Sequence, residues 1–399
     1  MTDFDKLYDR SQSPAEKWEK PAMKKHFGRD DLLPFWVADM EFQAPPSVRQ
    51  SLIKRAEDGI FGYEYRPDSL YDAIIHWYAS RHRWTIKKSD LCFSHGVMNA
   101  ITILINQHTE KGDGVIVQPP VFFEFRIAIV ENKRKMIRNP LIKTRQRYEM
   151  DFENLEKQAA NPRNKILILC NPHNPVGRVW TKEELQRVGE ICFRHNVLVI
   201  SDEIHADIIF LNHQYIPYAT AVTKDIAQQS FSCLSPAKTF NIASVTDALL
   251  IIPNQQYREQ YEAFNERYFL GKPNTFSVAA MESAYSHGGE WLNQFLDYLQ
   301  DNLDCLRDYL KERIPKVRLV EPEGTFLVWL DFRELGLDAR ELENFLAQKA
   351  RIALNSGYWF GRQGAGYARM TIACPQSMLK EGLSLLEQAI NELPETGKG

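Results

Sequence analysis

The sequence predicts an α/β protein with a large domain, built on a mainly parallel sheet flanked by helices, and a smaller α+β domain. The chain has 399 residues, which is long for a single compact unit. From about Ser47 to Ser286, short apolar runs alternate with longer amphipathic ones, as in successive βαβ units. After about Glu290 a long helical stretch leads into a different mixture of strands and helices. We therefore assign 47–286 to the large domain, and 1–46 together with 287–399 to the small domain.

The strands expected in the large domain are short apolar runs bounded by turn residues. They are Val115–Val117, Ile166–Leu169, Val197–Ile200, Phe231–Leu234 and Ala248–Ile252. A helix is expected to begin after Thr181, because Thr181 can cap it and Glu184 stands three residues later. A helix between two buried strands indicates a right-handed crossover and a parallel sheet.

The elements expected in the small domain do not alternate regularly as βαβ units. They are a helix over Trp291–Arg313, a strand over Thr325–Leu330, a helix over Ala339–Ala350, a strand over Ala368–Ala373 and a final amphipathic helix. The segment before about Ala44 precedes the first α/β element, so we expect it to pack against this domain.

Composition narrows the possible partners and the compartment. The formal net charge is −3 and the basic residues are spread along the chain, which gives no reason to expect nucleic acid or a membrane surface as a partner. The six cysteines are far apart, and no His/Cys cluster has metal-ligand spacing, so we expect free thiols and no metal. No secretory signal and no apolar run near the roughly 20 residues of a membrane span is present. These features predict a cytoplasmic protein.

Three polar residues each follow one of the expected strands: Asn174, Asp202 and Lys238. In an open parallel sheet, ligands bind at the carboxyl ends of the strands. Each residue has an ordinary explanation on its own, since Asp caps helices, Asn shapes turns and most lysines are solvated. Their occurrence in order after successive strands favours a shared site with an amide, a carboxylate and an amine.

Pyridoxal 5′-phosphate (PLP) requires this set of groups. An amine, here Lys238, forms a Schiff base with the cofactor aldehyde and later moves the Cα proton of the substrate. A carboxylate, here Asp202, keeps the ring nitrogen protonated and makes the ring an electron sink. A neutral donor near the ring hydroxyl is offered by Asn174. The sequence therefore predicts a PLP enzyme with Lys238 as its catalytic residue.

The other parts of the cofactor also find candidate partners. Backbone N–H groups at a helix start bind phosphate, and the turn formed by Gly96, Val97 and Met98 precedes an apolar helix. Ser235 adds a hydroxyl to the same anion, and Phe122 offers an aromatic face to the ring. Taken singly, a glycine that opens a helix and a phenylalanine in the core are both common.

A family resemblance is carried by motifs spread nearly from end to end. They are Leu33–Phe42, Phe61–Tyr63, Asn171–Gly177, Ser201–His205, Lys238–Asn241 and Gly366–Arg369. On these residues the chain resembles the PLP-dependent fold-type I family (aminotransferase class I/II). Within it, the chain is most similar to the MalY/PatB branch of cystathionine β-lyases and other cysteine-S-conjugate β-lyases.

The resemblance implies further roles. His205, which on its own is more often a structural histidine, would lie near the ring oxygen or support Asp202. Arg369 resembles the arginine that binds the substrate α-carboxylate, a task suited to the bidentate guanidinium. Tyr63 resembles the tyrosine that reaches the cofactor phosphate from the neighbouring subunit, which implies an obligate homodimer. Trp36 would lie in the segment that lines the substrate entrance.

The chain departs from the branch at four positions near the expected pocket. The branch usually has tyrosine at Phe122, serine at Ala237, glycine at Ser244 and a small residue at Asp247. None of these departures removes an essential cofactor contact, but all of them lie near the cofactor pocket and affect which substrate and which reaction type we expect.

The resulting expectation is α,β-elimination of L-cystathionine or a related cysteine S-conjugate to pyruvate, ammonia and a thiol. An aminotransferase uses the same lysine and the same carbanion, so the sequence leaves that function open as the alternative. A non-catalytic regulatory protein on the same fold is disfavoured, because Lys238, Asp202 and Arg369 are all present.

Overall fold

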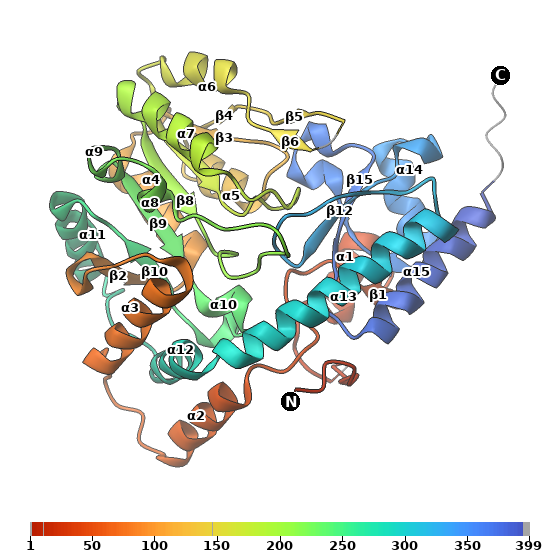
Figure 1. Cartoon of the computed structure of the whole chain (residues 1–399), viewed down its shortest axis with the longest axis horizontal. Helices are drawn as coiled ribbons and strands as arrows, with labels where there is room; N and C mark the ends of the chain where they lie inside the picture. The colour runs from red at the N-terminus through yellow and green to blue at the C-terminus, as the bar shows by residue number, and fades with distance from the viewer. Residues whose placement is uncertain (1, 11, 146, 394–399) are drawn as a thin grey trace.

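The computed structural model describes residues 2–10, 12–145 and 147–393, and it contains a seven-stranded sheet (Figure 1). The strand order is β2 (Leu91–Ser94), β10 (Ala248–Ile251), β9 (Ser230–Leu234), β8 (Leu198–Asp202), β7 (Asn164–Cys170), β3 (Gly114–Val117) and β4 (Lys135–Arg138). β10 runs antiparallel to both of its neighbours, and the other neighbouring strands pair in parallel. The predicted α/β class with a mainly parallel sheet is confirmed.

Helices cover both faces of this sheet because its central strands are apolar on both sides (Figure 1). Along β7, Ile166 and Ile168 belong to one core cluster and Leu167 and Leu169 to another. The first cluster lies under α4 (Val97–His108), α5 (Glu124–Val130) and α11 (Gln255–Arg267). The second lies under α6 (Phe152–Ala159), α7 (Lys182–Arg194) and α8 (Tyr218–Ala221), with α9 (Lys224–Ala227) beside them.

Helix α7 begins where the capping pattern predicts. The Thr181 hydroxyl accepts a hydrogen bond from the Glu184 N–H at 3.2 Å, and the Glu184 carboxylate accepts one from the Thr181 N–H at 2.9 Å. This capping box satisfies two N–H groups at the start of the helix.

A second helical layer connects the large sheet to the rest of the molecule. α2 (Pro46–Glu57), α3 (Asp68–His82) and α12 (Thr275–His287) pack together at the end of the sheet formed by β2 and β10. The long α13 (Gly289–Arg313) starts beside α12 and crosses to α15 (Gln376–Asn391) (Figure 1).

The second sheet is antiparallel, with the order β11 (Arg318–Val320), β12 (Leu327–Asp331), β15 (Tyr367–Thr371) and β14 (Asn355–Ser356). β12 begins two residues later than predicted, because Thr325 has a φ of 72° and its hydroxyl accepts from the Leu327 N–H at 3.0 Å. The expected helix over 339–350 divides into α14 (Ala339–Asn344) and a π-helical turn (Phe345–Lys349). A small hairpin joins β5 (Ile142–Lys143) to β6 (Tyr148–Glu149).

The N-terminal segment lies beside this second sheet. After α1 (Lys20–Phe27), β1 (Leu33–Pro34) pairs in parallel with β13 (Ile352–Ala353). The Glu41 N–H donates to the Ala373 carbonyl at 2.9 Å. The segment therefore contacts the region in which we place the small domain; the exact domain boundaries stay a prediction.

Three properties of the described residues concern compartment and metals. No helix in this part of the chain combines the length and apolarity that a membrane crossing requires. Within the same residues, no three or more His, Cys, Asp or Glu side chains gather as metal ligands would. All six cysteines are free thiols, and five of them are buried.

Candidate functional site

A cavity of about 400 Å³ lies where β7, β8 and β9 end. Asn174 comes from the loop after β7, Asp202 is the last residue of β8, and Lys238 lies on α10 (Pro236–Thr239) just after β9. All three line the cavity. They meet because the three strands are consecutive neighbours in the sheet, with Asp202 in register with both Cys170 and Cys233. The structure thus brings the amide, the carboxylate and the amine together.

The wall of the cavity includes both predicted and unpredicted residues. The further predicted ones are Gly96, Val97, Met98, Phe122, His205 and Ser235. Those that the sequence reasoning did not single out for the site are Ala38, His95, Glu124, Cys170, Ile204, Ala243 and Thr246. Glu124 had a local signal, since it is the one charge within an aromatic run that starts at Phe122. Ala38 had none, because it contributes a backbone carbonyl.

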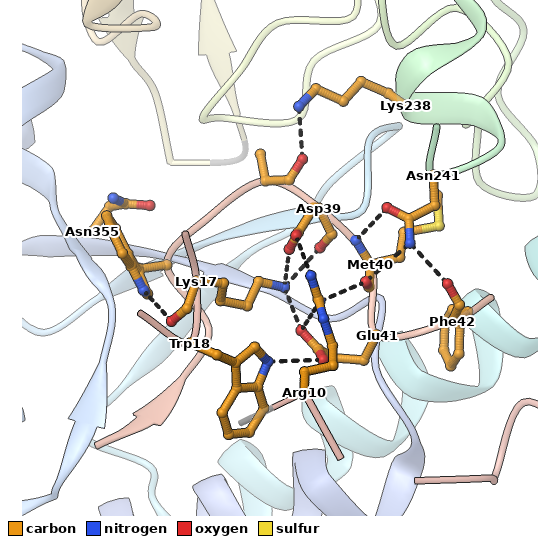
Figure 2. A network of polar contacts seen from close by, with 12 residues as sticks. Arg10, Lys17, Trp18, Asp39, Met40, Glu41, Phe42, Lys238, Asn241 and Asn355 are labelled. Carbon is orange, nitrogen blue, oxygen red and sulfur yellow. Dashed lines mark hydrogen bonds and ion pairs between the residues drawn. The ribbon is translucent and has the colours of Figure 1, made fainter. Parts of the chain in front are cut away.

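The Lys238 amine donates a hydrogen bond to the Ala38 carbonyl at 2.7 Å (Figure 2). Burial lowers the pKa of Lys238, and the nearby carboxylates of Asp39 and other residues oppose this shift without cancelling it. A lowered pKa increases the fraction of neutral amine, which is the form that attacks an aldehyde and accepts a proton.

The Asp202 carboxylate is buried at the carboxyl end of β8. Burial raises the pKa of Asp202 from 3.8 to about 7, although the Ile204 N–H donates to its Oδ1 at 3.2 Å and opposes the shift. A carboxylate with a raised pKa is one that lacks a sufficient positive partner. A protonated ring nitrogen against this oxygen would supply that partner.

The start of α4 opens onto the same cavity. Gly96 is the N-cap residue, and a Cβ atom placed on it would meet no heavy atom within 4 Å. The first N–H groups of a helix have no partner within it, so those of Val97 and Met98 are available to an anion. The Ser235 hydroxyl already donates to the Asp247 carbonyl at 3.0 Å, so binding phosphate with this proton requires it to release that bond.

Arg369 projects from β15 and is buried. Its guanidinium donates to three neutral oxygens: Asn174 Oδ1 at 3.1 Å, Asn355 Oδ1 at 2.6 Å and the Trp36 carbonyl at 2.9 Å. Burial lowers the pKa of Arg369 to about 9. Within the described part of the chain, its Nε has no hydrogen-bond partner and no carboxylate lies within ion-pair distance. A buried cation held only by neutral groups is suited to bind a carboxylate ligand.

Trp36 and Tyr63 do not line this cavity. The Trp36 indole donates to the Lys17 carbonyl at 3.0 Å and packs beside His26 and Phe27, so this residue reaches the site only through its carbonyl. The Tyr63 side chain is 95% exposed and lies in the segment after α2. Its expected contact with cofactor phosphate needs a second subunit and stays a prediction.

His205 and Asp247 have local explanations in the structure. His205 is buried with its ring edge against Phe326, and burial lowers its pKa well below the usual value, so the imidazole is neutral. The buried Asp247 pairs with Arg66 at 2.9 Å. This ion pair compensates the negative charge of Asp247, which does not line the cavity. Ser244 is exposed and does not line the cavity.

Residues 38–42, which we call the strap, run past the end of the Lys238 side chain (Figure 2), and Ala38 is the strap residue that lines the cavity. Asn241, three residues after Lys238, bonds to the backbone of Met40 and Phe42 at 2.8–3.1 Å. From the other side, Lys17 and Arg10 form ion pairs with Asp39 and Glu41. The strap is therefore held by both the α10 region and the N-terminal segment.

The donor set of this cavity fits PLP. Lys238 would hold the aldehyde, Asp202 the ring nitrogen, Asn174 the ring oxygen and the start of α4 the phosphate, while Phe122 is placed in the wall for the ring face. Two features favour such a ligand. The carboxylate of Asp202 has a raised pKa and would be stabilised by a positive ring nitrogen, and the turn at Gly96 leaves space beside the first N–H groups of α4.

Comparisons with known proteins agree with this arrangement. Residues 30–386 match the aminotransferase class I and II family. The chain is 38% identical to cystathionine beta-lyase PatB of Bacillus subtilis, over 97% of this chain and all of that protein. It is 35% identical to protein MalY of Escherichia coli, over 98% and 99% of the two chains. The crystal structure of cystalysin from Treponema denticola, which contains PLP, superposes with a TM-score of 0.94 at 32% identity, covering 99% of this chain and all of that one.

Proposed function

The chain belongs to the aminotransferase class I and II family, and from this premise we propose that it is a PLP-dependent carbon–sulfur β-lyase. Its reaction is the α,β-elimination of L-cystathionine or a related cysteine S-conjugate to pyruvate, ammonia and a thiol. The observation that carries the proposal is the meeting of Lys238 and Asp202 in one cavity, with Arg369 bonded to Asn174 in its wall. The relative named cystathionine beta-lyase PatB, which matches over 97% of this chain and all of its own length, supports this reaction within the family.

The chain's own residues have separate tasks in this reaction. When bound, PLP withdraws electrons from the substrate Cα, which makes both the Cα–H and the Cβ–S bonds easier to break. Arg369 orients the substrate by its α-carboxylate. The Lys238 amine, whose pKa is lowered by burial, accepts the Cα proton at Nζ as general base. Asp202 holds a positive charge at the ring nitrogen throughout.

The test is release of products from L-cystathionine. Purified enzyme with bound PLP should produce pyruvate and homocysteine in equal amounts, measured by a coupled assay and a thiol reagent. Amino-group transfer to a keto acid in place of pyruvate release would instead assign the protein as an aminotransferase.

The aminotransferase alternative rests on the same lysine and the same aspartate, so a panel of keto acids belongs in the first experiment. A non-catalytic regulatory role would require a protein that purifies without the absorbance band of bound PLP. The lowered pKa of Lys238 favours chemistry at this amine and argues against that role.

We also propose a homodimer in which Tyr63 reaches the partner's cofactor phosphate. Support comes from the run of exposed large side chains at Ile60, Phe61, Tyr63 and Tyr65, each at least 54% exposed. Sedimentation should give twice the chain mass, and Tyr63→Ala should weaken PLP binding. The six free thiols suit a reducing compartment, so we place the protein in the cytoplasm, which cell fractionation can check.

A further inference from the structure

Glu124 is a cavity residue to which the reaction above gives no task. It is the first residue of α5, is half-buried and lines the same cavity as Lys238. An acidic residue in the first turn of a helix is common, because its negative charge interacts favourably with the helix dipole. A carboxylate that serves only this purpose has no need to line the cavity that also holds Lys238 and Asp202.

The carboxylate of Glu124 has no cation bound to it within the protein. Over the residues that the structure describes, it makes no hydrogen bond and no ion pair. Burial raises the pKa of Glu124, Glu16 raises it further, and the positive charges of Lys238 and Arg369 act in the opposite direction. An acid removed from water without a partner is destabilising, and a cation supplied by a ligand relieves that cost.

The other polar groups of an amino-acid substrate and of PLP already have binding partners in the proposed site. Arg369 would bind the α-carboxylate, Lys238 the aldehyde and the start of α4 the phosphate. Glu124 is therefore left for a part of the substrate that lies beyond the reacting carbons, which in a cysteine S-conjugate is the group on the far side of the sulfur.

We propose that Glu124 makes this enzyme selective for cysteine S-conjugates that carry a positively charged group beyond the sulfur, such as the distal ammonium of L-cystathionine. The inference rests on the proposed function and names its substrate class. Glu124 would bind that ammonium by a charge-assisted hydrogen bond inside the cavity.

The experiment compares two thioethers that differ only in charge. S-(2-aminoethyl)-L-cysteine ends in an ammonium, and S-propyl-L-cysteine replaces that ammonium with a methyl group. The wild-type holoenzyme should prefer the aminoethyl compound in kcat/KM by roughly 10- to 100-fold, the range of a hydrogen bond to a charged group. Glu124→Gln should remove most of this preference. Glu131→Gln, at the exposed other end of α5, is the matched control and should keep it.

Binding provides a readout that does not depend on bond cleavage. The dissociation constants of both compounds, measured by calorimetry on holoenzyme, should show the same preference and the same loss in Glu124→Gln. If neither compound yields pyruvate, the proposed function fails, while the binding preference still tests Glu124. Equal binding of the two compounds by the wild type, or a preference that survives in Glu124→Gln, overturns the inference. If Glu124→Gln does not fold, the test uses Glu124→Asp and the wild-type preference for the aminoethyl over the propyl compound. The shorter acid should retain part of that preference.

Discussion

The buried Lys17 and the half-buried Lys238 donate to neighbouring carbonyls of the strap from opposite sides (Figure 2). Their environments shift their pKa values in opposite directions. Lys17 donates to the Asp39 carbonyl at 2.8 Å and Lys238 to the Ala38 carbonyl at 2.7 Å. Burial lowers the pKa of both amines. For Lys17, however, ion pairs to Asp39 and Glu41 at 2.5 and 2.8 Å raise the pKa above its usual value. Among the residues that the structure describes, no carboxylate comes so close to Lys238, and its pKa stays lowered.

The difference shows how the same residue type becomes structural in one place and reactive in another. Lys17 belongs to a closed cluster in which each charge has an opposite partner, so its amine stays protonated and fixes the strap. Lys238 and Asp202 line the cavity, and Arg369 borders it through its bond to Asn174; over the residues that the structure describes, none of the three forms an ion pair, so the Lys238 amine is available to a ligand. Unpaired buried charges around a cavity are typical of functional sites.

The largest expected effect comes from Lys238→Ala. This change should abolish turnover, because the same amine holds the aldehyde and moves the Cα proton. PLP should remain bound only non-covalently, which its absorbance spectrum and its removal by gel filtration would reveal. Lys157→Ala, at an exposed position on α6, is the control and should leave both properties unchanged. Full activity in Lys238→Ala would break the contrast between the two lysines.

The reciprocal change, Lys17→Met, should act on stability. It leaves the half-buried Asp39 and the buried Glu41 with Arg10 as their remaining cation, and removing one partner of a buried ion pair costs about 3–5 kcal/mol. Denaturant titration of the holoenzyme measures the loss. Lys20→Met, at the exposed start of α1, should change the free energy of unfolding by less than about 0.5 kcal/mol. An unchanged stability of Lys17→Met would show that the closed cluster does not hold the strap.

Arg369→Ala tests the second unpaired cation. It should weaken substrate binding by roughly 2–5 kcal/mol, because a buried carboxylate contact is lost, while PLP content stays the same. Titration with a substrate amino acid measures the affinity, and Arg340→Ala on α14 is the exposed control. An unchanged affinity would remove Arg369 from the substrate site.

The sequence predicted some contacts of this site and not others, and the difference depends on the kind of contact. Asn174, Asp202 and Lys238 were predicted from the residues because buried apolar strands are the strongest local pattern, and polar residues at their ends are conspicuous. Arg369 came only with the family resemblance, since its strand belongs to a different sheet. The Ala38 carbonyl had no signal in the sequence, because it meets Lys238 across 200 positions of the chain through backbone that every residue type carries.

Two aspartates, the buried Asp202 in the cavity and the half-buried Asp39 in the closed cluster, should give pH dependences of opposite sign. Burial raises the pKa of Asp202 from 3.8 to about 7, so in cofactor-free protein the unfolded state loses this proton first, and stability falls as pH rises from about 4 to 7. Although burial opposes it, Lys17 and Arg10 keep the pKa of Asp39 lowered, so its contribution is present above pH 3.8 and is lost as pH falls through its folded pKa.

Urea titrations at several pH values should detect the opposite slopes. Subtracting the curve of Asp202→Asn from that of the wild type isolates a loss of about 4 kcal/mol by pH 7, since the pKa rises from 3.8 to about 7 and each pKa unit corresponds to about 1.4 kcal/mol. Subtracting the curve of Asp39→Asn should give a slope of the other sign, and that slope is confined to acidic pH. Adding PLP should flatten the Asp202 slope, because a protonated ring nitrogen gives this carboxylate the partner that Asp39 already has. A slope that PLP leaves unchanged would mean that the cofactor ring nitrogen does not contact Asp202.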